Sequence, residues 1–196
     1  MCEKALRALD PSALEHVKSY NEAIPEYMLI MIVNYQHWES FVHAYQYESN
    51  REALLKTAAS RDWPPAVRHA VALSPLSVLD AAVPVTARHG SIESLRLLAD
   101  HGANLEEAVL SAAFGQRQDV MNFLLAQGVA QKAWEKYKPH CLGRGTYLPH
   151  TLSLDLIYGN KIWPALEFLQ QSVERFALNT AVQKFEENKA QPTKKM

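Results

Sequence analysis

Two similar stretches of the chain are the strongest indication of its fold. Residues 86–102 read TARHGSIESLRLLADHG, and residues 112–128 read AAFGQRQDVMNFLLAQG. Each begins with a pair of small residues, passes a glycine, continues as an apolar run with helical spacing, and ends at a second glycine. The two stretches start 26 residues apart, at 86 and 112. A fixed period of this size is the signature of a repeat architecture.

The same frame extends in weaker form on both sides. Upstream, Ile32-Val33 and Ala58-Ala59 each open a segment that leads into a second apolar run. Downstream, Leu156-Ile157 opens another, 44 residues after Ala112 instead of 26. One connection therefore carries about 18 extra residues, and we place this insertion at 129–151.

The pattern of small residues, glycine and apolar run in each unit predicts a hairpin of two helices. The small pair lets a neighbouring helix approach closely, and a glycine in the turn adopts a left-handed conformation at little cost. We expect this of Gly90, Gly115 and Gly159. Gly102 and Gly128 are expected to end the second helix of their units. A single hairpin cannot bury its own apolar face, so the core must come from stacking neighbouring hairpins.

The order small-small-x-x-Gly, followed by a helix ending Leu-Leu-x-x-Gly, resembles the ankyrin repeat. The likeness is closest over 80–130 and looser over 25–175. The Thr-Pro-Leu-His signature of the family is absent, and the period is shorter than the usual value of about 33 residues. Reduced loops between repeats would explain the short period. An unrelated solenoid of α-hairpins is the alternative.

The resemblance implies an all-α solenoid of about five ankyrin-like helical hairpins with a capping helix at both ends. Residues 1–24 form the N-terminal capping region, and 25–171 form the repeats with the insertion at 129–151. Residues 172–185 form a C-terminal capping helix, since their apolar residues recur every three or four positions. Residues 186–196 form a polar tail.

Composition supports a globular protein and excludes some classes. The chain has 196 residues, 48% of them hydrophobic, and its formal net charge is −1. Proteins that bind nucleic acid or a membrane surface usually carry an excess of basic residues, so a net charge close to zero does not favour either function. The longest apolar run, 27–33, is too short to span a bilayer. We expect a soluble, cytoplasmic protein without a cofactor. The tail is weakly similar to the C-terminal signals of bacterial type IV effectors, which implies delivery into a host cytosol.

Ankyrin-like folds bind partner proteins through their concave face, so the resemblance implies a protein partner. The candidate positions follow the small pair of each first helix: Asn34, Tyr35, Ser60, Arg61, Arg88, His89, Phe114 and Tyr158. The basic and aromatic insertion would suit an acidic partner and adds Trp134, Tyr137, Arg144 and Tyr147. Tyr, Arg and Phe are typical anchors of protein interfaces. The alternative is that these are ordinary helix-end residues.

The sequence therefore predicts a non-enzymatic protein–protein interaction module: an inhibitor, an adaptor or an effector-type protein. The alternative is a cysteine-dependent enzyme with Cys141 as the nucleophile, which would need a histidine brought close by the tertiary fold. His140, Cys141 and His150 match no zinc-ligand spacing, so we predict no metal site. The identity of the partner and the oligomeric state stay open.

Overall fold

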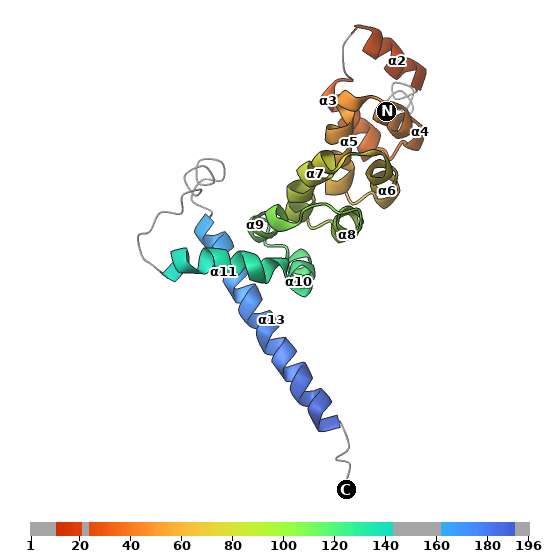
Figure 1. Ribbon diagram of the computed structural model, residues 1–196. Helices are drawn as coiled ribbons and strands as arrows, with labels where there is room; N and C mark the ends of the chain where they lie inside the picture. Colours follow the sequence, from red (N-terminus) through yellow and green to blue (C-terminus); the bar gives the residue numbers. More distant parts are fainter. Residues whose placement is uncertain (1–10, 21–23, 143–161, 191–196) are drawn as a thin grey trace.

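The computed structural model describes residues 11–20, 24–142 and 162–190, and every regular element in these ranges is a helix (Figure 1). The described residues contain no β-strand. The prediction of an all-α protein is thus confirmed. None of the described helices is both long enough and apolar enough to cross a membrane.

Four hairpins follow one another along the chain. Their helices are α3 (Glu26–Asn34) and α4 (Trp38–Tyr45), α5 (Glu48–Ser60) and α6 (Pro64–Leu73), α7 (Leu76–His89) and α8 (Ile92–Asp100), and α9 (Glu106–Phe114) and α10 (Gln118–Ala126). Three further helices flank them: α2 (Pro11–Tyr20), α11 (Val129–Leu142) and α13 (Ile162–Ala190).

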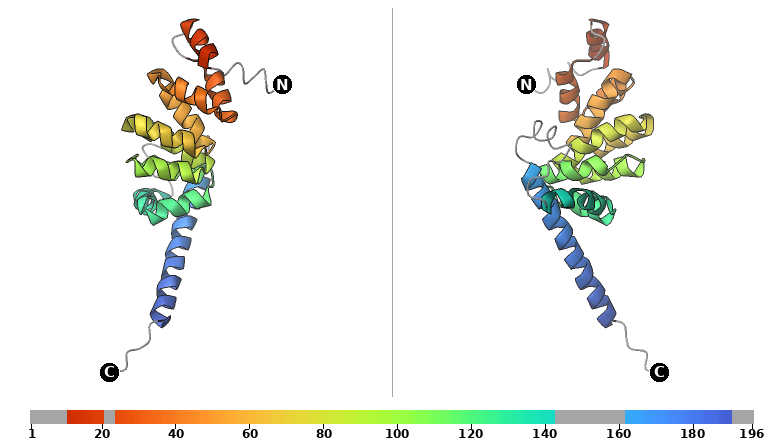
Figure 2. Two further views of the ribbon diagram at one scale, coloured as in Figure 1. Left: turned by 90° about the vertical axis from the view of Figure 1, so that its right-hand side faces the viewer. Right: turned by 60° about the vertical axis from the view of Figure 1, so that its left-hand side comes forward.

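The hairpins stack in chain order. The first helices α3, α5, α7 and α9 form one row in which each packs against the next, while α4, α6 and α8 form a second row beside it. Figure 2 shows the paired helices lying one above another along the stack. At the N-terminal end α2 packs against α4 and buries Leu14 completely. This helix lies within residues 1–24, which the sequence predicts to form an N-terminal cap.

The small pairs lie at the centre of the stack. Ala58, Ala59, Ala87, Ala112 and Ala113 are all at most 1% exposed. Because alanine lets helices approach closely, α5, α7 and α9 pack along most of their lengths. The second helices add large apolar side chains, and Leu95, Leu98 and Leu124 are fully buried among them. This core repeats from one hairpin to the next.

All four turns within the hairpins have the same backbone structure. In each, the first N–H after the turn donates to the carbonyl five residues earlier: His37 to Ile32, Trp63 to Ala58, Ser91 to Thr86 and Arg117 to Ala112, at 2.9–3.3 Å. The residue just before each donor has a positive φ: Gln36, Asp62, Gly90 and Gln116. This is the Schellman arrangement that ends a helix with one left-handed residue.

One glycine prediction is wrong. Gly115 has φ −79°, and its neighbour Gln116 carries the left-handed conformation with φ 52°. Gly115 instead has a packing requirement, because a Cβ there would lie 2.4 Å from the carbonyl oxygen of Arg88. Gly90, Gly102 and Gly128 do have positive φ values, as expected. Gly159 lies outside the described residues.

The C-terminal part departs from the predicted division. Val129–Leu142, the first part of the predicted insertion, is the helix α11, which packs against α9, α10 and α13. Ile162–Ala190 is one continuous helix, so the boundaries drawn at 171/172 and 185/186 both fall inside it. Its packing against α9 places it in the row of first helices, whereas a repeat opened by Leu156-Ile157 would make it a second helix. No glycine or proline follows Pro164 within α13, so nothing in the sequence stops the helix.

Candidate functional site

The four turns within the hairpins form one edge of the stack, which we call the turn edge. It comprises residues 34–37, 60–63, 88–91 and 114–117. Hydrogen bonds join neighbouring turns along it. The Ser91 hydroxyl donates to the carbonyl of Ser60 at 3.1 Å, and the Arg117 Nε donates to the carbonyl of Arg88 at 3.0 Å. These two bonds hold the second, third and fourth turns in a fixed order.

Asp62 adds a further link between the second and third hairpins. One of its carboxylate oxygens accepts a hydrogen bond from the Ser94 backbone N–H at 3.1 Å and another from the Ser94 hydroxyl at 2.8 Å. Ser94 lies in the first turn of α8, where a backbone N–H has no partner within its own helix. Asp62 thus caps a helix of the next hairpin, a role usually filled by the residue that starts the helix.

Several residues predicted from the sequence lie exposed on the turn edge. Asn34 ends α3 and Tyr35 follows it, Arg61 follows α5, and Arg88 and His89 end α7. Tyr35 is 46% exposed. Ser60 is half-buried, and its hydroxyl donates to the carbonyl of Thr57. The structure therefore brings six of the predicted positions to one side of the stack, in three successive hairpins.

The turn edge is basic in a chain of nearly neutral charge. Its sixteen residues include Arg61, Arg88 and Arg117 and one acidic residue, Asp62, whereas the formal net charge of the whole chain is −1. The Asp62 carboxylate is occupied by Ser94. Sequence reasoning missed Arg117, although its place directly after Gln116 corresponds to that of Ser91 after Gly90. The three guanidinium groups give this edge a positive electrostatic potential.

A second surface adjoins this edge and was also missed. It is the side of α3 and α7 turned away from the second helices, which we call the first-helix face. Tyr27 is 64% exposed there, and Ile30, Met31, Pro84 and Val85 are half-exposed. The signal was present in the sequence, since Tyr27, Ile30 and Met31 recur at intervals of three and four on the side opposite Leu29 and Ile32.

Other predicted site residues are covered by neighbouring helices. Phe114 is half-buried and packs against Ile162 and Leu166, so α13 lies over it. Trp134 is only 7% exposed and belongs to the main core. An amphipathic helix at 129–142, in place of an exposed loop, turns this ring inward. Tyr158, Arg144 and Tyr147 lie outside the described residues.

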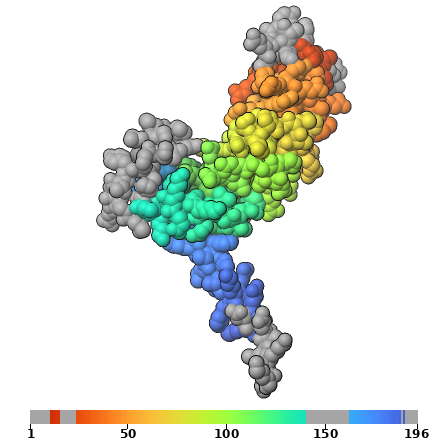
Figure 3. All heavy atoms as spheres, viewed as in Figure 1, coloured from red at the N-terminus to blue at the C-terminus, as the bar shows by residue number. Residues whose placement is uncertain are grey.

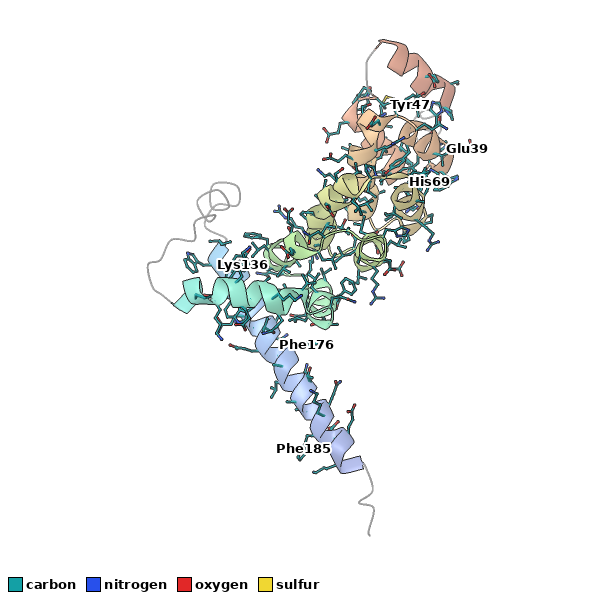
Figure 4. All side chains as sticks on the ribbon, viewed as in Figure 1. Glu39, Tyr47, His69, Lys136, Phe176 and Phe185 are labelled. Atoms are coloured by element: carbon teal, nitrogen blue, oxygen red, sulfur yellow. The ribbon has the colours of Figure 1, made fainter. Side chains whose placement is uncertain are left out.

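A hollow lies between the start of α9 and α11, at the opposite end of α9 from the turn edge. It encloses about 320 Å³ and is lined by Asn104, Leu105, Glu106, Val129, Lys132, Ala133, Lys136 and Tyr137. Figure 4 labels Lys136 on α11. Burial, and then the charge of Glu106, raise the pKa of the Tyr137 hydroxyl, so this group stays protonated at neutral pH. Tyr137 is thus placed in a cleft, half-buried, rather than on an open surface.

Aromatic rings gather in the first two hairpins. Trp63 is 6% exposed, and its ring meets that of Phe41 at 5.3 Å and that of Trp38 at 6.4 Å. His69, labelled in Figure 4, lies 5.4 Å from Trp38. Trp163 is on α13, far along the chain, and is 50% exposed. Trp63 therefore fills the space between the first two hairpins, whereas Trp38 packs against it with 43% of its own surface exposed.

Cys141 belongs to the last turn of α11, and its side chain lies outside the described residues. Its role as a nucleophile stays a prediction. Within the ranges that the structure describes, no three His, Cys, Asp or Glu side chains gather closely enough to hold a metal ion.

Comparison of the chain with known proteins found no match. The chain matches no protein-family model, and no curated protein and no solved structure is significantly similar to it.

Proposed function

We propose that this chain is a non-enzymatic protein–protein interaction module, an ankyrin-like solenoid that binds its partner through the turn edge and the adjoining first-helix face. It acts as an inhibitor, an adaptor or an effector-type protein. The partner segment carries acidic residues that face Arg61, Arg88 and Arg117. Apolar residues of the partner lie on the first-helix face.

One observation carries this proposal: equivalent positions of successive hairpins are aligned and tied together. The Ser91–Ser60 and Arg117–Arg88 hydrogen bonds fix the spacing of the turns before any partner arrives. Because a rigid surface loses little conformational entropy on binding, a pre-ordered row of arginine and tyrosine side chains favours recognition of a protein segment. Adjacent packed helices lie about 8–10 Å apart. An extended chain, at roughly 3.3 Å per residue, would therefore meet a new hairpin about every third residue.

The test is affinity capture with three forms of the full chain, followed by mass spectrometry of cross-linked peptides. The first form is unaltered. The second replaces Tyr35, Arg61 and His89 with alanine on the turn edge. The third is a matched control with Glu39→Ala, Arg68→Ala and Asp100→Ala, which changes three exposed positions on second helices of the same three hairpins.

The turn-edge variant is expected to lose capture while its stability stays within about 1 kcal/mol of the unaltered chain, because surface substitutions rarely cost more. The control variant is expected to capture as the unaltered chain does. Capture that is equal for all three forms would contradict the proposal and move the binding surface elsewhere. The change Cys141→Ala should leave capture unaffected.

A further inference from the structure

The two halves of α13 present their apolar side chains in opposite directions. In the first half, Ala165, Leu169 and Val173 are buried against the hairpins. In the second half, Leu178, Val182 and Phe185 are 65%, 48% and 60% exposed. At about 100° per residue, Leu178 lies half a turn around the helix axis from Leu169. The apolar side therefore changes from facing the hairpins to facing away from them.

The second half of α13 extends beyond the stack. Figures 1 and 3 show it running away from α10 and α11, with Phe185 near its far end in Figure 4. The residues Leu178, Val182 and Phe185, which we call the α13 stripe, are spaced by four and then three positions. This is the spacing by which one helix packs against another in a coiled coil. The stripe faces away from the described hairpins, so they do not cover it.

We propose that the α13 stripe is a dimer interface, and that its occupant is the same stripe of a second copy of this chain, running antiparallel. An interface with two-fold symmetry must be complementary to itself, because each residue meets a different residue of the same patch. With the two-fold axis between Ala181 and Val182, Leu178 of one copy lies level with Phe185 of the other. Two such apolar pairs form the centre of the contact.

The charges beside the stripe fit this arrangement. On the helix circumference Arg175 and Glu186 lie on the same flank of the stripe, and antiparallel pairing brings each within one helical turn of the other in the second copy. Glu174 lies level with Lys189, whose ammonium group sits over the Phe185 ring at 4.7 Å. The charges that flank the stripe are therefore complementary to themselves when two copies of this chain pair antiparallel.

The length of the contact limits its strength. Residues 174–189 overlap in this arrangement, which is about 24 Å of helix at 1.5 Å per residue. One short helix pair buries less than the roughly 1,200–2,000 Å² of a standard stable interface. The dimer is therefore weak and forms only as the concentration rises. Since the stripe is separate from the turn edge, this inference does not depend on the proposed function.

Sedimentation equilibrium of the full chain over roughly 1–500 μM tests the dimer. The apparent mass is expected to rise from 22.1 kDa towards twice that value. The variant Leu178→Glu with Phe185→Glu is expected to stay monomeric throughout. The matched control is Leu73→Glu, because Leu73 on α6 is 54% exposed and is thus similar in exposure. It should dimerise as the unaltered chain does.

Two further experiments test the pairing direction. The changes Arg175→Glu and Glu186→Arg should each weaken the dimer at least several-fold, and the double variant should restore it. In a Cys2→Ser, Cys141→Ser background, Ala181→Cys should form a disulfide between copies. Glu174→Cys should not, because its two copies lie about 20 Å apart along an antiparallel pair.

The proposal is overturned if the chain stays monomeric at all concentrations, or if Leu178→Glu with Phe185→Glu dimerises like Leu73→Glu. A monomer that binds neutral lipid vesicles through the stripe would assign this surface to a membrane instead. Cross-linking through Glu174→Cys would overturn the antiparallel arrangement.

Discussion

In the turn of the fourth hairpin, one residue must adopt a left-handed backbone and the residue before it must lack a side chain. Gln116 accepts a left-handed backbone, with φ 52°, although it carries a side chain. Gly115 has an ordinary φ but no room for a Cβ, because the Arg88 carbonyl of the previous hairpin approaches so closely. A glycine in a sequence can mean either requirement. Only the neighbouring hairpin decides between them, which is why the sequence prediction for Gly115 failed.

This difference predicts how two alanine substitutions behave. Gly115→Ala is expected to lower the free energy of unfolding by about 2–3 kcal/mol, because the third and fourth hairpins must move apart. Gly128→Ala, where φ is 71° and no atom lies within 4 Å of the added Cβ, should cost only about 1 kcal/mol. Urea denaturation of both variants measures the two losses. Equal losses would mean that the contact with Arg88 is unimportant.

The helices of the first four hairpins are the part of the fold that the sequence predicts best. Their small pairs at 32, 58, 86 and 112 mark helix ends that the structure places in equivalent turns. The prediction works because the signal is local: it needs only the spacing within one hairpin.

The predictions for α11 and α13 failed because their positions depend on distant contacts. The segment 129–142 is rich in basic and aromatic residues and contains Pro139, a pattern that favours a loop when read alone. Its helix is stabilised by packing against α9, α10 and α13. The same packing buries Trp134, so a residue predicted to bind a partner became part of the core.

The second helices supply a test of the stacked core. Leu98 in α8 is fully buried and Leu125 in α10 is 4% exposed. Replacing either with alanine is expected to lower the free energy of unfolding by roughly 2–5 kcal/mol, from lost burial and the cavity left behind. Leu73→Ala, at an exposed position, should change it by about 0.5 kcal/mol or less. Thermal or urea unfolding monitored by circular dichroism measures these changes, and near-neutral results for both buried sites would contradict the stacking.

At the scale of the whole molecule, α13 divides into a half that completes the core and a half that does not. Leu110 and Phe114 of α9 pack against Ile162 and Leu166 in the first half. From Ala177 onward the described side chains are exposed, apart from Thr180, which is half-buried. We therefore expect the stability of the stack to depend mainly on the first half.

Truncation separates the two halves. A chain ending at Ala177 is expected to unfold within about 0.5 kcal/mol of the full chain when both are studied at low micromolar concentration. A chain ending at residue 161 exposes Leu110 and Phe114 to water and should be destabilised by several kcal/mol or aggregate. Urea titration with tryptophan fluorescence gives both values. A large loss on removing 178–196 would show that this segment packs against the stack.

The links across the turn edge reach only from one hairpin to the next. Ser91 bonds to Ser60, Ser94 to Asp62 and Arg117 to Arg88, and no bond among these skips a hairpin. Because each hairpin is hydrogen-bonded only to its neighbours, a terminal hairpin can open while the central hairpins stay folded. Amide hydrogens in α7 should therefore exchange with deuterium most slowly, and protection should fade step by step towards α3. The molecule would therefore open first at its N-terminal hairpin, and the hairpin of α7 and α8 would open last.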